Sequence, residues 1–313
     1  MHRHVNVNNT TKIRRISLST TLPALVRTND PENLSLLAHI PKGLSYPVDI
    51  IVCSKNARRK SKLVKQHVYT RQLPDWCFIR INDKVAVSAP ALCFFQMASE
   101  LPLIKLIELG FEFCGTYSRH ENRADKESDP ASKTIYGHQL LTNVKTLKAF
   151  SNLMVGVSGN KRTCRALRYI ANGSASPMET ILFMLLTLPY KLGGYGLRGA
   201  ELNRRIDLRK AARQRSGKSY YVCDIFWAEA NLAIEYDSNM YHTGADRIAD
   251  DSKKRIELEA YGITVVTVTS IQIRSIKDFE ALAKLVARKL GKQLQYKNPR
   301  FLIAHRELRD MLL

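Results

Sequence analysis

The sequence has no hydrophobic run long enough to cross a membrane. Its longest predominantly apolar stretch covers residues 181–188, whereas a membrane-spanning helix needs about 20 such residues. The N-terminal stretch MHRHVNVNNTTKIRR also lacks the apolar core of a secretory signal. We therefore expect a cytoplasmic protein with no membrane partner.

Motifs for bound zinc, for disulfides and for nucleotides are missing as well. The six cysteines (53, 77, 93, 114, 164 and 223) form no CxxC pair and have no histidine at zinc-binding spacing. They therefore predict reduced core residues of a cytosolic protein. The glycine-rich stretch GGYG at residues 193–196 matches neither the P-loop nor the dinucleotide fingerprint, so no phosphate role is expected for it.

Acidic residues are scarce. The chain contains 28 Asp and Glu against 49 Lys and Arg, a formal net charge of +21. Such an excess favours polyanionic partners, nucleic acid ahead of membrane surfaces. The densest basic segment spans residues 197–219, and arginine is preferred where phosphate is gripped by paired donors. We expect this segment to bind nucleic acid through Arg198, Arg204, Arg205, Arg209, Lys210, Arg213, Arg215 and Lys218.

The 313 residues are enough for two domains. Residues 1–20 are polar and basic and are expected to form an arm. A polar stretch at 118–134 is expected to be an exposed loop between an α+β accessory domain at 21–135 and a second domain at 136–295. Residues 296–313 are expected to form a basic helix.

Apolar periodicity predicts several helices. Pro90 stands near the start of a helical stretch at 89–109, and Pro102 divides that stretch in two. Further helices are expected at 142–152, 161–172, 245–261 and 278–290. The β-branched run ITVVTVT at 263–269 predicts a buried strand.

Two alternating, aromatic and β-branched segments at 220–227 and 232–236 predict a β-hairpin. With the centre of the turn between Glu229 and Ala230, Asp224 falls directly opposite Glu235. Directly opposed residues lie about 4.5–5.5 Å apart at Cβ and point to the same face. The hairpin therefore predicts that these two carboxylates meet.

The period of two in a strand adds Asp237 to the face of this carboxylate pair. Three carboxylates on one face repel one another, and a divalent cation would offset the repulsion because hard cations take carboxylate oxygens. Acidic residues at strand edges are also often simply solvated, and that alternative stays open. The opposite face is predicted to carry Cys223, Ile225, Ile234 and Tyr236.

Ser176, Pro177 and Glu179 form the start signal of a helix. Serine fits the N-cap, proline fits the first turn, and glutamate three residues after the cap completes a capping box. This account is sufficient for Glu179. A second account is that Glu179, one turn into a helix packed on the sheet, also reaches the metal.

Five elements follow one another along the chain: a helix with Glu, a strand with Asp, a strand with Glu-x-Asp, a charged helix and a buried strand. This order resembles the PD-(D/E)XK nuclease fold, and more narrowly the very-short-patch-repair-like endonucleases. The matching segments are SPMETILFMLL (176–186), YVCDIFW (221–227), LAIEYDSNMYH (232–242), DDSKKRIELEAYG (250–262) and ITVVTVT (263–269). Residues 251–262 keep the family's D-x2-R-x3-L-x3-G spacing, with Lys254 in place of arginine. The resemblance implies an α/β fold with a restriction-endonuclease-like mixed sheet flanked by helices.

The same resemblance implies a site for Mg2+ or Mn2+. Asp224, Glu235 and the backbone carbonyl of Tyr236 would bind the metal, and Glu179 would assist through its water shell. The superfamily's catalytic lysine position holds Asp237, as is usual in this subfamily. The positive charge would then come from Lys254 first, or from Lys253 or His242. Two further departures are Ser238 for a glycine and Thr267 for an arginine.

Residues 46–109 resemble the C-terminal part of AbiEi-type antitoxins, with no winged-helix segment before them to bind a promoter. The expected function is a metal-dependent endodeoxyribonuclease that hydrolyses phosphodiester bonds in a defence, repair or mobile-element context. The alternative is a nuclease fold that has lost catalysis and acts as an antitoxin-like DNA-binding regulator. An RNA-processing protein shares the same charge argument, and DNA is ranked ahead of RNA.

Overall fold

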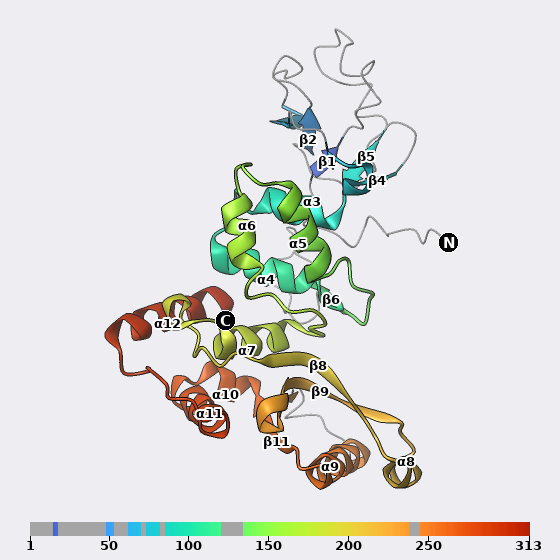
Figure 1. Cartoon of the computed structure of the whole chain (residues 1–313), viewed down its shortest axis with the longest axis vertical. Helices are drawn as coiled ribbons and strands as arrows, with labels where there is room; N and C mark the ends of the chain where they lie inside the picture. The colour runs from blue at the N-terminus through green and yellow to red at the C-terminus, as the bar shows by residue number, and fades with distance from the viewer. Residues whose placement is uncertain are drawn as a thin grey trace. The chain divides into compact units, whose positions relative to one another are not determined.

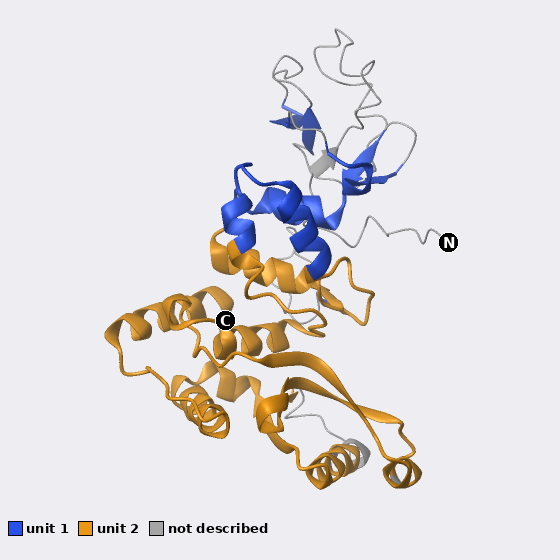
Figure 2. Cartoon of the chain, in the orientation of Figure 1, with its two compact units in different colours: residues 1–101, 120–134, 145–164 blue, residues 102–119, 135–144, 165–313 orange. Residues whose placement is uncertain are grey.

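The computed structural model of the chain describes residues 15–17, 48–52, 62–69, 73–81, 85–119, 134–237 and 245–313. These residues form helices and small mixed sheets, which places the chain in the α/β class (Figure 1). The chain divides into two compact units, drawn in different colours in Figure 2. Unit 1 contains residues 1–101, 120–134 and 145–164, and unit 2 contains residues 102–119, 135–144 and 165–313.

Unit 1 contains a five-stranded sheet in the order β3-β2-β1-β5-β4. Its strands β1, β2 and β3 are parallel, and β5 runs antiparallel to both β1 and β4. The apolar residues Ile50, Ile51 and Val52 of the internal strand β2 are buried. The strands are β1 (Arg15–Ser17), β2 (Val48–Val52), β3 (Val64–Val68), β4 (Phe78–Arg80) and β5 (Ala86–Ser88).

Two prolines set the helix boundaries that the sequence predicts. Pro90 is the first residue of α3 (Pro90–Met97), and Pro102 is the N-cap of α4 (Leu103–Phe113). The predicted helices at 142–152 and 161–172 are observed as α5 (Val144–Leu153) and α6 (Asn160–Ala166), the second one shorter than predicted. Within unit 1, Phe95 of α3 packs edge-to-face on Phe150 of α5, with ring centroids 5.6 Å apart.

The ends of the predicted loop at 118–134 are strands. β6 (Tyr117–Arg119) pairs with β7 (Thr134–Tyr136), and residues 120–133 lie outside the described residues. The predicted arm at 1–20 likewise lies almost wholly outside them. None of the described cysteines forms a disulfide; Cys77, Cys93, Cys114 and Cys223 are buried as predicted, whereas Cys164 is exposed.

Unit 2 contains a four-stranded sheet in the order β11-β10-β9-β8. The strands β8 (Ala200–Asp207), β9 (Tyr220–Trp227) and β10 (Leu232–Asp237) are antiparallel neighbours. The strand β11 (Thr264–Thr269) is parallel to β10, and α9 (Ala245–Ala260) forms the crossover between them. The helix α7 (Pro177–Thr187) has an almost continuously buried surface from Glu179 to Leu186, so it is covered on all sides.

The predicted buried strand at 263–269 is observed as β11, but it is buried only in part. In β11 only Val265 and Val268 are buried, and Thr267 is exposed. The strand lies at the edge of the described sheet. One face of such a strand packs on the core while the other stays accessible, and the β-branched composition alone does not report this.

The hairpin register agrees with the prediction. Trp227 pairs with Leu232, Phe226 with Ala233 and Ile225 with Ile234. A 3-10 turn at Ala228–Ala230 connects the strands, and Asn231 closes it with φ of 45°. Asparagine is one of the few residues other than glycine that adopt this left-handed conformation readily.

The remaining helices of unit 2 are α8 (Lys210–Ser216), α10 (Ser270–Arg274), α11 (Ile276–Lys289) and α12 (Pro299–Leu312). Helix α8 lies at the end of the long β8–β9 hairpin (Figure 1), so the basic segment 197–219 forms this strand and helix. The predicted basic C-terminal helix exists as α12, but its His305 and Arg309 are buried. Every helix among the described residues is too short or too polar to cross a lipid bilayer.

Candidate active site

The Asp224 carboxylate lies in unit 2 where the β9–β10 ladder opens. The last paired residues before it are Ile225 and Ile234, and beyond them Asp224 Oδ2 accepts a hydrogen bond from the backbone N–H of Tyr236 at 2.8 Å. Burial raises the pKa of Asp224, although the Tyr236 N–H and the charge of Lys254 act in the opposite direction. A carboxyl group is therefore held between two strands at a position where its charge is poorly solvated.

Glu235 lies on the neighbouring strand and carries the ion pair of the site. Lys254 Nζ of α9 donates to Glu235 Oε2 at 2.6 Å, with both side chains about four-fifths buried (22% and 17% exposed). The other carboxylate oxygen, Oε1, is buried and has no hydrogen-bond partner. Burial and then the charge of Asp224 raise the pKa of Glu235 to about 7, against the lowering effect of Lys254.

The predicted assignment of Cys223 to the opposite face was wrong. Its thiol lies close enough to Glu235 to lower the pKa of that carboxylate, although a thiol is a weak donor and leaves Oε1 unsatisfied. Cys223 also belongs to the same buried cluster as Phe226 and Ala233. The strict alternation of faces along β9 is therefore interrupted at Asp224.

A backbone distortion on the neighbouring strand, at Asn203 of β8, lies opposite Asp224. In the β8–β9 ladder Leu202 pairs with Ile225 and Arg204 pairs with Cys223, but the pair between them, Asn203 with Asp224, is skipped. Asn203 has φ of 48°, a left-handed backbone inside a strand. The pairing register of β8 with β9 is the same before and after Asn203. Neither strand therefore gains a residue, and the distortion stays local.

Glu179 is tied to the same place from the start of α7. Ser176 Oγ accepts from the Glu179 N–H at 3.1 Å, as the predicted capping interaction requires. Glu179 Oε2 accepts from the backbone N–H of Ala175 at 2.9 Å, one residue before the cap, and from Asn203 Nδ2 at 2.8 Å. Burial and then the charge of Asp224 raise the pKa of Glu179.

Asp224 is thus the central charge of the site, because it raises the pKa of both Glu179 and Glu235. Asn203 of β8 ties this strand to the start of α7, since its Nδ2 donates to Glu179 and also to the carbonyl of Gly173 at 2.8 Å. Sequence reasoning missed Asn203. The available signal was an asparagine inside an otherwise strand-like segment, where this residue is disfavoured.

Not every predicted site residue joins this group. Asp237 ends β10 opposite Thr269 of β11. Across the described ranges, no group of three or more His, Cys, Asp or Glu side chains is placed to hold a metal ion. Lys253 is exposed, and His242 and Ser238 lie outside the described residues. The structure therefore assembles Asp224, Glu235 and Lys254, with Glu179 linked through charge and through Asn203.

The predicted nucleic-acid-binding residues are exposed wherever their side chains are described, which excludes only Arg215. In the β8–β9 ladder Arg204 lies opposite Cys223 and Arg205 lies opposite Val222, one and two residues along from Asp224. Several of these cations already have partners: Arg204 with Glu201 (2.8 Å), Arg205 with Asp207 (2.7 Å) and the Tyr220 ring (4.0 Å), Arg209 with the Tyr261 ring (5.2 Å), and Lys218 with Asp250 (3.3 Å).

Comparisons with protein-family models, with curated proteins and with solved structures each found no match for this chain.

Proposed function

We propose that this chain is a metal-dependent endonuclease with a restriction-endonuclease-like core, which hydrolyses phosphodiester bonds of DNA. One observation carries the proposal. Two poorly solvated carboxylates, Asp224 and Glu235, occupy adjacent antiparallel strands; burial raises the pKa of both, and the charge of Asp224 raises that of Glu235 further. Perturbed acids of this kind are typical of functional sites.

The donor set fits a hard divalent cation. Asp224, Glu235 and the backbone carbonyl of Tyr236 would hold Mg2+ or Mn2+, with water completing the coordination shell. The buried Glu235 Oε1, which has no hydrogen-bond partner, is an oxygen that such an ion would satisfy. When bound, the metal would supply an activated water and neutralise charge on the phosphate oxygens.

The chain's own residues provide the remaining functions. Lys254 Nζ holds Glu235 Oε2 at 2.6 Å and keeps a positive charge beside the reacting phosphate. Glu179 Oε2 accepts hydrogen bonds from the Ala175 N–H and from Asn203 Nδ2. These bonds hold the carboxylate of Glu179 where it interacts with the charge of Asp224. Arg204 and Arg205, exposed on β8 opposite Cys223 and Val222 of β9, hold the phosphate backbone, which makes binding fall steeply with salt.

Plasmid nicking by Asp224→Ala tests the proposal. Nicking in Mg2+ should be lost, while DNA binding measured without metal should be retained. Asp207→Ala is the matched control, because Asp207 is an exposed acid on the neighbouring strand β8. Nicking by Asp224→Ala at the rate of the unsubstituted protein would remove the proposal.

A second candidate is a DNA-binding regulator that has lost catalysis. It is favoured by the lack of a group of three metal-ligating side chains in the described part of the chain. It is also favoured by Asp237 at the superfamily's lysine position. This candidate predicts salt-sensitive DNA binding, no Mg2+-dependent cleavage and no rise in Tm with metal. A cleavage assay that includes RNA as well as DNA substrates distinguishes an RNA-processing protein from both candidates.

A further inference from the structure

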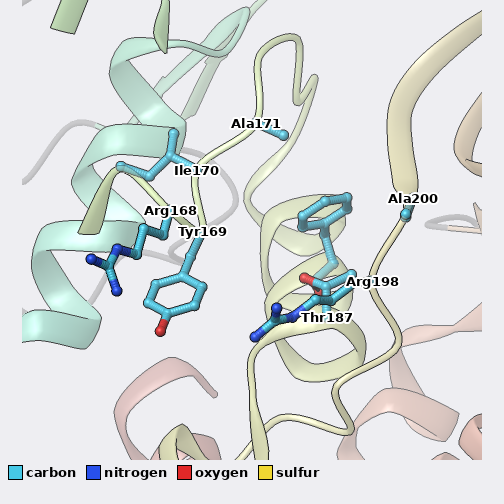
Figure 3. Close-up of a pocket in the computed structure, with 9 residues that line it drawn as sticks. Arg168, Tyr169, Ile170, Ala171, Thr187, Arg198 and Ala200 are labelled. Carbon is cyan, nitrogen blue, oxygen red and sulfur yellow. Dashed lines mark hydrogen bonds between the residues drawn. The ribbon is translucent and has the colours of Figure 1, made fainter. Parts of the chain in front are cut away.

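A pocket of about 370 Å³ opens in unit 2 between the segment after α6 and the start of β8 (Figure 3). Its lining includes Arg168, Tyr169, Phe183, Thr187 and Arg198. Its size falls within the range of small-molecule sites, about 300–1,000 Å³. Phe183 packs edge-to-face on Phe111, with ring centroids 5.5 Å apart. The pocket therefore has a rigid aromatic wall and polar groups at its rim.

The charge of this pocket is entirely positive. No acidic side chain lines it. Within the described part of the chain, neither Arg168 nor Arg198 forms an ion pair, unlike Arg204 and Arg205 farther along β8. Figure 3 shows the Arg198 guanidinium and the Tyr169 ring facing each other across the hollow. This combination fits a ligand with a negative group and a flat ring, because guanidinium grips phosphate and an aromatic ring stacks on a base.

The pocket continues the candidate active site along the same two elements. Glu179, Phe183 and Thr187 are spaced four residues apart and share one face of α7. Glu179 contacts Asn203 of β8, while the pocket is bounded by Arg198 and Ala200 at the start of that strand. With a rise of 1.5 Å per residue, Phe183 and Thr187 lie about 6 Å and about 12 Å along the helix from Glu179. Stacked nucleotides span such a distance in about two to four steps of about 3.4 Å.

We propose that this pocket binds one unpaired nucleotide of the substrate strand, a few nucleotides from the bond to be cleaved. Arg198 and Arg168 bind its phosphate, and the Tyr169 ring stacks on its base. The proposal rests on the proposed function for the position of the cleaved bond, but the binding itself needs neither metal nor catalysis. It predicts a preference for DNA with a single-stranded segment over fully paired DNA.

The test measures binding by fluorescence anisotropy in the Asp224→Ala protein without divalent metal. The probes are labelled dT12 and a 12-nucleotide strand with abasic residues, which carries the same phosphates without bases. Tyr169→Ala should weaken dT12 binding about tenfold and leave abasic binding nearly unchanged. Tyr169→Phe should keep the ratio of the two affinities. Arg198→Ala, an exposed substitution that does not threaten the fold, should weaken binding of both probes.

Arg306→Ala is the control, since it removes an exposed guanidinium of α12 outside the pocket and should not change the ratio of the two affinities. Equal losses for both probes in Tyr169→Ala, or no loss for either probe in Arg198→Ala, would overturn the pocket. Thymidine monophosphate as competitor should displace dT12 only at far higher concentration; efficient displacement would show that the pocket serves a free nucleotide instead. If the probes behave as expected but the unsubstituted protein does not cleave DNA, the pocket stands and the nuclease proposal falls.

Discussion

Lys254 Nζ lies 2.6 Å from Glu235 Oε2, a contact between a crossover helix and the strand that precedes it. The ion pair satisfies one oxygen of Glu235 and leaves the other, Oε1, buried and without a hydrogen bond. Asp224 on the next strand opposes ionisation of Glu235. The site thus combines two poorly solvated carboxylates with a lysine, Lys254, that favours their ionised forms.

Asp224→Asn should stabilise the protein while abolishing cleavage. The amide still accepts a hydrogen bond from the Tyr236 N–H, but it no longer repels Glu179 and Glu235. We expect a gain on the order of 1 kcal/mol at pH 8 in urea denaturation, typical of relieved functional strain. Asp207→Asn, which removes an exposed ion pair with Arg205, should give no gain. A loss of stability in Asp224→Asn would argue against repulsion at the site.

Glu235 should make stability depend on pH. Its pKa of about 7 in the folded state lies above 4.5, its value when unperturbed. The folded state therefore binds the extra proton, and the stability this contributes is complete below about pH 4.5 and lost as pH rises through about 7. The Tm of Glu235→Gln, relative to the unsubstituted protein without metal, should rise between pH 5 and pH 8. A constant difference in Tm across that range would contradict the raised pKa.

Lys254→Met should move metal binding to higher pH. The lysine charge lowers the pKa of both Asp224 and Glu235, so its removal leaves them protonated to higher pH. Mg2+ titrations followed by calorimetry between pH 6 and pH 9 should show weaker binding at the acidic end and partial recovery at the alkaline end. Lys253→Met, an exposed neighbour on the same helix, is the matched control and should bind Mg2+ normally. Identical pH profiles for the two variants would mean that Lys254 does not act on the site.

Asn203→Ala should destabilise the protein more than Asn231→Ala. Both residues have left-handed φ (48° and 45°), so alanine brings a similar backbone strain of about 1–2 kcal/mol to each position. Only Asn203 also bonds Glu179 and Gly173, and losing a bond to a charged group adds roughly 1.5–3 kcal/mol. Urea denaturation of the two variants measures the difference. Equal losses would show that the Asn203 side chain contributes nothing beyond its backbone.

The sequence predicts well what is local. The hairpin register follows from a short connection between two alternating segments, and the start of α7 follows from Ser176, Pro177 and Glu179. These features depend on residues within a few positions of one another. For the same reason Pro90 and Pro102 fix the boundaries of α3 and α4 correctly.

What the sequence does not predict depends on distant segments. Asn203 contacts residues 24 and 30 positions away, and it has a left-handed backbone opposite Asp224, where the face alternation of β9 is interrupted. The partial exposure of β11 depends on its edge position in the sheet, and the burial of Arg309 depends on which helix covers it. Neither property is visible in hydrophobic periodicity.

The buried Arg309 ties α12 to the helix α10. Its Nη2 donates to the carbonyl oxygens of Ile273 and Arg274 at 2.7 Å each, and so closes the C-terminal end of α10. Helix α10 directly follows β11, the strand on which β10 and its Glu235 are paired. A chain cut before residue 299 would leave both carbonyls without their donor and loosen the support of that strand. Removing α12 to improve crystals or expression would thus disturb Glu235 indirectly, through α10 and β11.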